Sequence, residues 1–228
     1  MTIRVIGLDA DDTLWHSEDG FHSVTARFCE LVGPYAIDPS TLAVTLDVVE
    51  RRNMVLFGYG VKSFTLSMVE AAIEVSGGQV PAETIQRLVD EGRTLLARPV
   101  ELLEGVEETL AALAGSYRMV VITKGDLLHQ EQKFHGSGLD AHVEGIDVVS
   151  EKDARTYSRL MVRYGVEPGG FVMVGNSVRS DVLPVLEVGA RAVHIPYEYL
   201  WGHEAAEHDG GVPTLGSITE LPGWLSGG

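Results

Sequence analysis

The sequence predicts an α/β fold in which a central parallel sheet is interrupted, after its first strand, by an inserted helical segment. Five short apolar runs each end in a polar or glycine-rich turn, as buried strands do; they are residues 3–8, 119–122, 146–149, 171–174 and 192–195. From residue 119 onward these runs alternate with helical patterns, which is typical of βαβ units. Residues 19–98 carry helical patterns and no strand pattern, so we expect a core of residues 1–16 and 99–228 and a helical domain of residues 17–98.

Proline, glycine and capping residues divide the helical segment into four expected helices. The first ends near residue 32, and the second follows an N-cap at Asp38 with proline in the next position. The third carries an apolar stripe over residues 64–75, and the fourth begins at Pro81 and ends near residue 97. In the core, residues 153–164 form an amphipathic pattern, and Gly165 is expected to end that helix.

Composition excludes several classes of protein. The 228 residues include 17 Lys and Arg against 33 Asp and Glu, and the net charge of −16 argues against non-specific nucleic-acid binding. No apolar run approaches the length of about 20 residues that a membrane-spanning helix needs, and residues 1–9 lack the pattern of a signal peptide. The single cysteine, Cys29, permits no internal disulfide. We therefore expect a cytoplasmic protein that binds neither nucleic acid nor membrane.

Polar clusters follow the first four predicted strands, at the edge of a parallel sheet where binding sites form; they are residues 9–15, 123–126, 150–153 and 175–181. Asp9, Asp11 and Asp12 lie within four residues and repel one another unless a cation compensates their charge. Carboxylates, water and a substrate phosphate are typical ligands of Mg²⁺, to which Asp181 could add a further ligand. The sequence therefore indicates a magnesium site at this edge.

The other two clusters indicate a binding site for an anion. Thr123, with the amides of Lys124 and Gly125, could bind an oxyanion where a helix begins. Lys152 could neutralise both the aspartates and a phosphate. Taken singly, each of these residues also fits an ordinary role, as a helix cap or a solvated surface residue. The expectation of a site rests on their shared position at one sheet edge.

Together these motifs resemble those of the haloacid dehalogenase-like hydrolase superfamily. The first motif is a strand followed by Asp-x-Asp-x-Thr-Leu, here at residues 9–14, and the second is Thr123 at the end of a strand. The third is a lone lysine, Lys152, and the fourth is an acidic turn, here Gly175 to Asp181. The resemblance spans almost the whole chain. It implies a Rossmann-like three-layer core with a central parallel sheet and, between the first and second motifs, an inserted α-helical cap of the C1 type.

The resemblance also implies roles for the motif residues. Asp9 is the expected nucleophile that forms an aspartyl-phosphate, and Asp11 is the expected general acid and base. Thr13 is expected to position Asp11 or the turn, and Lys152 to hold Asp9. The residues expected to bind the substrate or its phosphate are Thr13, Thr123, Lys124, Gly125 and Lys152.

The cofactor that the resemblance implies is Mg²⁺. Its expected ligands are Asp9, Asp181 and the main-chain carbonyl of Asp11, with Asn176 and Ser177 behind them. Asn176 stands where the first acid of the fourth motif is usual. Its amide oxygen could still ligate the metal or bond a metal-bound water, but one negative charge is lost, so we expect a lower metal affinity.

Two further features depart from the motifs or extend them. Asp12 replaces a common glycine, and its side chain is expected to point to solvent. Around a glycine turn of the helical domain lie five candidates for contacting the substrate: Arg51, Arg52, Asn53, Tyr59 and Lys62.

The predicted function is a Mg²⁺-dependent phosphatase that hydrolyses a small phosphomonoester. Its expected partner is a small-molecule phosphate ester, and the chain is expected to be a monomer or a homodimer. A 2-haloacid dehalogenase remains an alternative, although Asp11 argues against it, because members of that group lack an acid there. A phosphomutase or phosphonatase and a non-catalytic binding module are further alternatives. The sequence does not identify the substrate.

Overall fold

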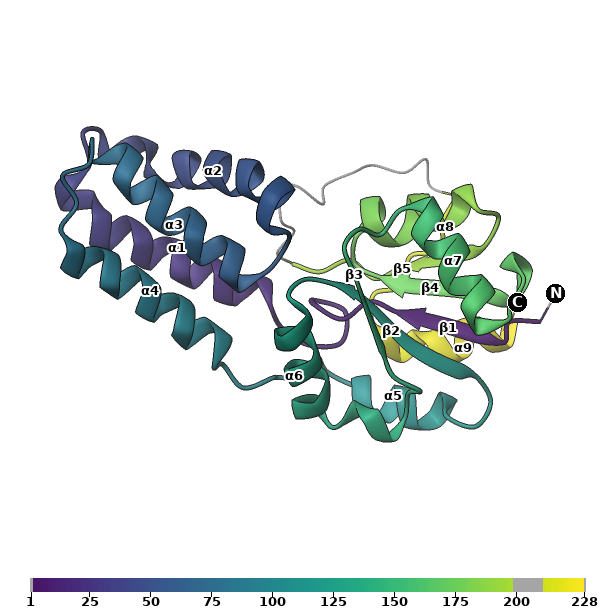
Figure 1. Cartoon of the computed structure of the whole chain (residues 1–228). Helices are drawn as coiled ribbons and strands as arrows, with labels where there is room; N and C mark the ends of the chain where they lie inside the picture. Colours follow the sequence, from purple (N-terminus) through teal and green to yellow (C-terminus); the bar gives the residue numbers. More distant parts are fainter. Residues whose placement is uncertain (1, 199–210, 228) are drawn as a thin grey trace. The chain divides into compact units, whose positions relative to one another are not determined.

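The computed structural model describes residues 2–198 and 211–227, which divide into two compact units (Figure 1). The core unit comprises Met1–Glu18, Val100–Lys124 and Gln130–Gly228, and the helical unit comprises Asp19–Pro99 and Gly125–His129. The predicted division at residues 17 and 99 lies within two residues of these limits. The segment Gly125–His129 differs, because the sequence placed it in the core and its contacts group it with the helical unit.

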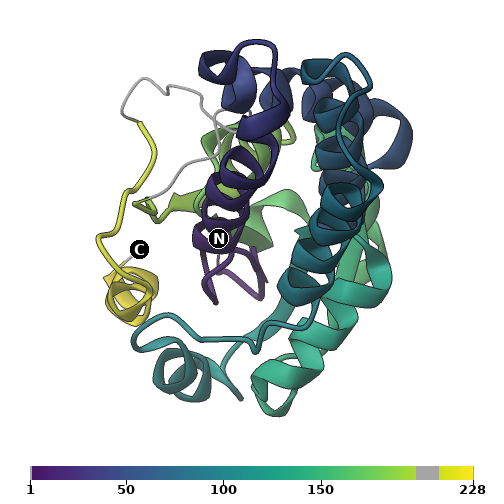
Figure 2. The ribbon, with the colours of Figure 1, turned by 90° about the vertical axis from the view of Figure 1, so that its left-hand side faces the viewer.

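The helical unit consists of four helices that lie side by side in Figures 1 and 2. They are α1 (Glu18–Val32), α2 (Leu42–Phe57), α3 (Val61–Val75) and α4 (Ala82–Leu96). Phe28, Leu46, Met68 and Leu88, one from each helix, lie in its shared buried core. The four predicted helices are confirmed, although Asp38 caps a short 3-10 turn, Pro39–Thr41, and α2 begins only after it.

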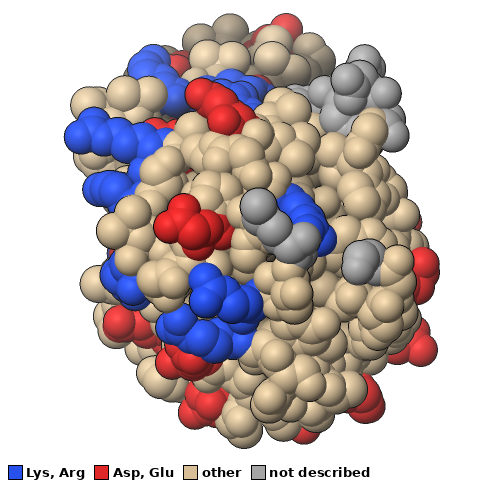
Figure 3. Space-filling model, turned by 90° about the vertical axis from the view of Figure 1, so that its right-hand side faces the viewer, with Lys and Arg blue, Asp and Glu red and all other residues tan. Residues whose placement is uncertain are grey.

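The surface carries both signs of charge. Figure 3 shows acidic and basic side chains together on one face of the molecule, so neither sign covers that face alone. Within residues 2–198 and 211–227, no helix combines the length and the apolar character that a bilayer-spanning segment requires.

The core unit is built on a five-stranded parallel sheet in the order β3-β2-β1-β4-β5. The strands are β1 (Val5–Leu8), β2 (Arg118–Lys124), β3 (Ile146–Val149), β4 (Phe171–Gly175) and β5 (Arg191–His194). All five predicted strands are confirmed, with bounds that shift by at most two residues. Because β1 lies between β2 and β4, the strand order reverses beside it, and such a point is where parallel sheets bind ligands.

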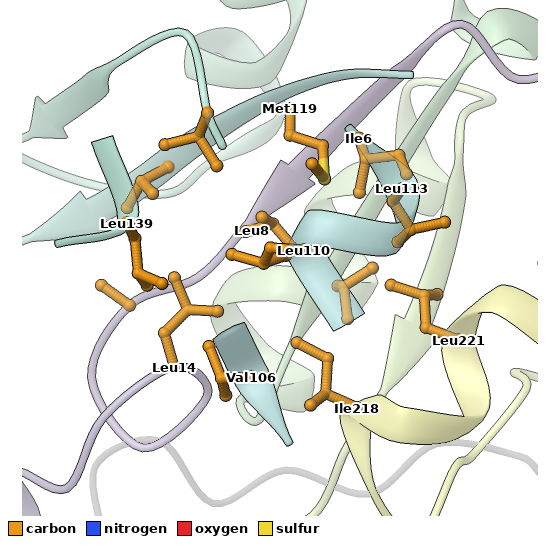
Figure 4. Packing of buried hydrophobic residues seen from close by; sticks show 14 of the residues in the cluster. Ile6, Leu8, Leu14, Val106, Leu110, Leu113, Met119, Leu139, Ile218 and Leu221 are labelled. Atoms are coloured by element: carbon orange, nitrogen blue, oxygen red, sulfur yellow. The ribbon is translucent and has the colours of Figure 1, made fainter. Parts of the chain in front are cut away.

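Helices cover both faces of this sheet. One face, shown in Figure 4, packs Ile6, Leu8 and Met119 against α5 (Val106–Leu113) and the C-terminal α9 (Leu221–Gly227). Phe134 of α6 (Leu127–Ser137) joins the same cluster. The other face packs against α7 (Ala154–Tyr164) and α8 (Leu183–Glu187). Side chains that alternate along each strand therefore fill two separate cores, which gives the predicted three-layer α/β fold.

Short helical turns connect these elements. They are the 3-10 turns Gly33–Tyr35, Pro39–Thr41, Leu139–Ala141, Pro168–Gly170 and Ile218–Glu220, and the π-helical turn Val178–Val182. The predicted stop at Gly165 is confirmed: its φ of 64° is left-handed, and its N–H bonds carbonyl oxygens of the last turn of α7.

Candidate active site

Asp9 follows the central strand directly. Its main-chain N–H donates to the carbonyl oxygen of Val174 at 2.8 Å, so the sheet pairing continues one residue past β1. The chain then turns, and the Thr13 hydroxyl donates to Asp9 Oδ2 at 2.9 Å. Of the two roles predicted for Thr13, this contact agrees with positioning the turn, because a separation of four residues places its hydroxyl against Asp9.

Lys152 connects Asp9 to Asp181, which lies in the turn after the neighbouring strand β4. It lies between β3 and α7, and its Nζ donates to Asp9 Oδ1 and, at 2.7 Å, to Asp181 Oδ1. The side chains of Lys152 and Asp181 are 2 % and 1 % exposed, so this is a buried ion pair and not a surface contact. The structure thus brings together three residues that are far apart in the sequence.

Asp181 is fixed by the π-helical turn after β4. The Ser177 N–H donates to Asp181 Oδ2 at 3.0 Å, and the Ser177 hydroxyl accepts from the Ser180 N–H at 3.0 Å. Gly175 makes room for the carboxylate, since a Cβ there would lie 2.3 Å from Asp181 Oδ2. The N–H of Ser177 therefore orients Asp181. Asn176 contributes its main-chain oxygen to a different contact, 3.0 Å from His194 Nε2.

The single ammonium group of Lys152 bonds two buried carboxylates, and this imbalance of charge shifts the pKa values of the site. Burial raises the pKa of Asp9 to about 7; the charge of Asp181 adds to the shift and Lys152 opposes it. Burial alone lowers the pKa of Lys152, but Asp181 and Asp9 outweigh it and raise this pKa above its usual value. Lys152 therefore stays charged, and the pair of aspartates carries a negative charge that it does not fully neutralise.

Asp11 has its own set of donors. Trp15 Nε1 donates to Oδ1 at 2.6 Å, Gln130 Nε2 donates to Oδ2 at 2.7 Å, and Lys133 Nζ donates to Oδ1. Burial alone raises the pKa of Asp11, but Lys133 together with the hydrogen bonds from Gln130 and Trp15 outweighs it, and the pKa is lowered. The two expected catalytic carboxylates therefore have separate cationic partners.

Asp12 does not point to solvent, so that prediction is wrong. Its side chain accepts from the N–H of Ser17 at 2.9 Å and of Glu18 at 3.2 Å, where α1 begins. The residue is buried and has a left-handed φ of 63°. Burial raises the pKa of Asp12 to about 7, with the charge of Asp11 adding to the shift. The conformation explains the glycine that is common in the motif, and the capping contact explains what an aspartate gains there.

The predicted phosphate loop is divided between the units. Thr123 is buried at the end of β2, and its hydroxyl lies 3.2 Å from the carbonyl oxygen of Lys124. The Lys124 Nζ donates to the Ser180 hydroxyl at 3.0 Å and lies 3.5 Å from Glu151. Gly125 has a positive φ of 124° and groups with the helical unit.

Three residues that bond the Asp11 side chain are not among the predicted site residues. Gln130 and Lys133 are three residues apart on α6, which places them on one helix face after the second motif. That spacing was the available signal, but nothing in the sequence shows that this face meets Asp11. Trp15 was counted only as part of the turn.

The residues present fit a divalent cation in their chemistry. Asp9 and Asp181 supply carboxylate oxygens with excess negative charge, which is the donor type that Mg²⁺ prefers. The described residues contain no group of three or more His, Cys, Asp or Glu arranged to hold a metal ion. The carboxylate of Asp11 bonds Trp15, Gln130 and Lys133, and a metal contact through its main-chain carbonyl stays a prediction.

Four of the five candidate contacts bond partners within the helical unit: Arg51, Arg52, Asn53 and Lys62. Arg51 donates to Asp47, and Arg52 donates to Glu70 and Glu74. The buried Asn53 donates to Ser67 and Glu70. Lys62 bonds both oxygens of Asp126 at 2.9 Å, and Tyr59 lies in the turn between α2 and α3. A role in substrate contact stays a prediction for these five residues.

Solved structures of other proteins share this fold. The chain is 42 % identical to a haloacid dehalogenase-like family hydrolase from Xanthomonas campestris, with a TM-score of 0.88 over 99 % of this chain and 91 % of that one. A 2-haloacid dehalogenase from Pseudomonas syringae pv. Tomato shares the fold at 18 % identity, with a TM-score of 0.64 over 99 % of both chains.

A curated relative carries an enzymatic name. The N-acylneuraminate-9-phosphatase of Rattus norvegicus is 27 % identical over 170 residues, which are 68 % of this chain and 64 % of that protein. The match thus spans somewhat less than two thirds of the relative. The family model for haloacid dehalogenase-like hydrolases matches residues 3–189, which include every motif residue described above. This chain belongs to the haloacid dehalogenase-like hydrolases.

Proposed function

We propose that this hydrolase is a phosphatase that acts on a small phosphomonoester through an aspartyl-phosphate on Asp9. The observation that carries the proposal is the second carboxylate, Asp11, which lies two residues from Asp9 and has its own cationic partner, Lys133. An alkoxide leaving group needs a proton, whereas a halide does not. A carboxylate that can exchange protons therefore supports phosphate ester chemistry over dehalogenation, and the named phosphatase relative is consistent with it.

The residues divide the reaction into two steps. The Asp9 carboxylate attacks phosphorus, the bond to the ester oxygen breaks, and the leaving alkoxide takes a proton from Asp11. Water then attacks the phosphorus of the aspartyl-phosphate and gives a proton to Asp11, and inorganic phosphate leaves Asp9.

Lys152 and a bound cation would reduce the repulsion between the Asp9 carboxylate and the substrate phosphate. Lys152 orients Asp9 and offsets its charge in a buried site. Asp9, Asp181 and the main-chain carbonyl of Asp11 would hold Mg²⁺, which when bound supplies positive charge against the substrate phosphate. We propose this metal from the uncompensated carboxylate charge, and EDTA should therefore abolish turnover.

Hydrolysis of 4-nitrophenyl phosphate and of phosphorylated metabolites, with Mg²⁺ or EDTA, tests the proposal. Asp9→Asn should lower kcat at least about 10³-fold, because it removes the nucleophile. Asp11→Asn should lower kcat about 10²- to 10⁴-fold while phosphate still binds. Asp140→Asn, at an exposed position in the core unit, is the matched control and should leave kcat unchanged.

Two results would contradict the phosphatase proposal. The first is phosphate release that persists in Asp9→Asn. The second is halide release from 2-chloropropionate by an enzyme that releases no phosphate from any ester in the panel.

A further inference from the structure

The side chain of Asp11 is held by two residues of α6 that belong to none of the four motifs. Lys133 Nζ donates to Oδ1, and Gln130 Nε2 donates to Oδ2 at 2.7 Å. Lys133 also lies 5.8 Å from the centre of the Trp15 ring, and Trp15 donates to the same oxygen, Oδ1, at 2.6 Å. Both oxygens of Asp11 are therefore bonded, which fixes the rotamer of the carboxylate.

Gln130 is oriented by its acceptors. Its Nε2 donates to Asp11 Oδ2 and, at 2.8 Å, to the carbonyl oxygen of Lys124, so both of its hydrogens are used. Its Oε1 is buried without a partner among the described residues, and such groups are rare in folded proteins. Rotating the amide would turn this oxygen toward two other oxygens. The chain tolerates an unpaired oxygen here and in return links the turn after β1 to the end of β2.

The environment of Lys133 differs from that of a surface lysine. Its side chain is 12 % exposed, while the Asp11 side chain that it bonds is 30 % exposed. The carboxylate is therefore the more accessible member of the pair, and the lysine is packed behind it against Trp15. Asp9 is held by a different pair of donors, Thr13 and Lys152. Each of the two neighbouring carboxylates is thus positioned independently of the other.

We propose that Lys133 and Gln130 are positioning residues that hold the Asp11 carboxylate for proton transfer to the leaving group. The inference rests on the proposed phosphatase function. This role requires no contact with the substrate, because both residues act through Asp11. Loss of either should impair the step that needs a proton more than the binding of phosphate or the attack by Asp9.

The basicity of the leaving group separates this role from a merely structural one. The 4-nitrophenolate ion is a weak base that leaves without a proton, whereas phenolate and especially an alkoxide need one. The experiment measures kcat/KM, which covers the steps up to formation of the aspartyl-phosphate, for 4-nitrophenyl phosphate, phenyl phosphate and glycerol 1-phosphate with Mg²⁺. Wild type is compared with Lys133→Met, Lys133→Arg and Gln130→Leu.

Lys133→Met should lower kcat/KM about 10²-fold for the most basic leaving group that wild type accepts, and less than about 5-fold for 4-nitrophenyl phosphate. Gln130→Leu should change the ratio of kcat/KM for 4-nitrophenyl phosphate to kcat/KM for the most basic leaving group by about 10-fold, because one donor is lost and the ion pair remains. Lys133→Arg should restore most of the activity, since it keeps a donor and a charge. Arg163→Met, which removes an exposed cation from Asp147 on the core unit, is the matched control and should leave the ratio unchanged.

Equal losses on all substrates in Lys133→Met and Gln130→Leu, or no loss in either, would overturn the positioning role. Should Lys133→Met fail to fold, as circular dichroism would reveal, Gln130→Leu and Lys133→Arg still give the leaving-group comparison. A wild-type enzyme that releases no phosphate from any ester in the metabolite panel would instead refute the proposed function, and with it this inference.

Discussion

The ion pairs of the candidate active site and those on α2 of the helical unit lie in opposite environments. In the core unit, Lys152 and its two aspartates are almost fully buried. In the helical unit, the pairs of Arg51 with Asp47 and of Arg52 with Glu70 and Glu74 have side chains that are 40 % exposed or more. Removing one partner therefore costs far more free energy at the candidate site than on α2. Water screens the exposed pairs of α2 and is excluded from the buried pairs of Lys152.

The burial of an ion pair indicates whether it belongs to a functional site or to the solvated surface. Exposed pairs are worth little, and the protein can lose one without consequence. A buried charge that loses its partner is costly, whereas the intact pair adds little net stability over apolar residues in its place, so a buried pair is a candidate for a role in function. Pairs of this kind lie in the core unit at the edge where the motifs predict chemistry, and the three substitutions below test the contrast in order of expected effect.

Lys152→Met should have the largest effect. It leaves Asp9 and Asp181 buried without their cation, so we expect a loss of about 3–5 kcal/mol in the free energy of unfolding and loss of phosphatase turnover. Urea unfolding in EDTA at pH 8 measures it. The matched control, Arg163→Met, removes an exposed cation and should cost less than about 1 kcal/mol.

This loss should also depend on pH. Since the folded-state pKa of Asp9 is raised to about 7, protonation favours the folded state at low pH, and that contribution disappears as the pH rises through about 7. Without the ammonium of Lys152 the carboxylates repel more strongly when ionised, so the cost should be smaller at pH 5 than at pH 8. Equal costs at both values would mean that the two carboxylates are not the cause.

Glu50→Gln should have an intermediate effect of opposite sign. Burial raises the pKa of Glu50 to about 7, with Asp47 adding and Arg51 opposing. The folded state therefore binds a proton more tightly, and stability decreases as the pH rises from about 4.5 to about 7. Glutamine removes this dependence and should stabilise the protein by about 1–2 kcal/mol at pH 8, after allowance for partial exposure, and by nearly nothing at pH 4.

Urea unfolding of wild type and Glu50→Gln at both pH values checks this. A substitution that destabilises the protein at pH 8 would show that Glu50 has a favourable partner when ionised. The half-buried carboxylate of Glu50 would then resemble the carboxylates of the candidate active site in having a favourable partner.

Arg52→Met should have the smallest effect. Its two partners are exposed, so we expect a change of less than about 1 kcal/mol in stability and less than about twofold in kcat/KM. Thermal unfolding and initial rates on the preferred ester measure both. A large increase in KM with unchanged stability would instead place Arg52 among the substrate contacts, as its position beside the glycine turn suggested.

Much of the architecture could be read from the sequence. The five strands are short apolar runs with clear polar ends, and the helices have glycine and proline limits, so local pattern and tertiary structure agree. Helix α5 was missed, because Val106–Leu113 is short and its apolar residues are not bounded by a recognised cap. Segment Gly125–His129 was assigned to the core because sequence order gave no reason to separate it from β2.

The sequence by itself determined which residues carry charge and where along each strand they lie. It placed Asp9, Thr123, Lys152 and Asp181 at one sheet edge, because parallel strands end together. Only the tertiary structure decided which of them pair. Thr13 bonds Asp9, the side chain of Asp12 turns inward to cap α1, and Asp11 is held from α6. These choices depend on side-chain directions and on packing between elements that are distant in sequence, and a one-dimensional pattern contains neither.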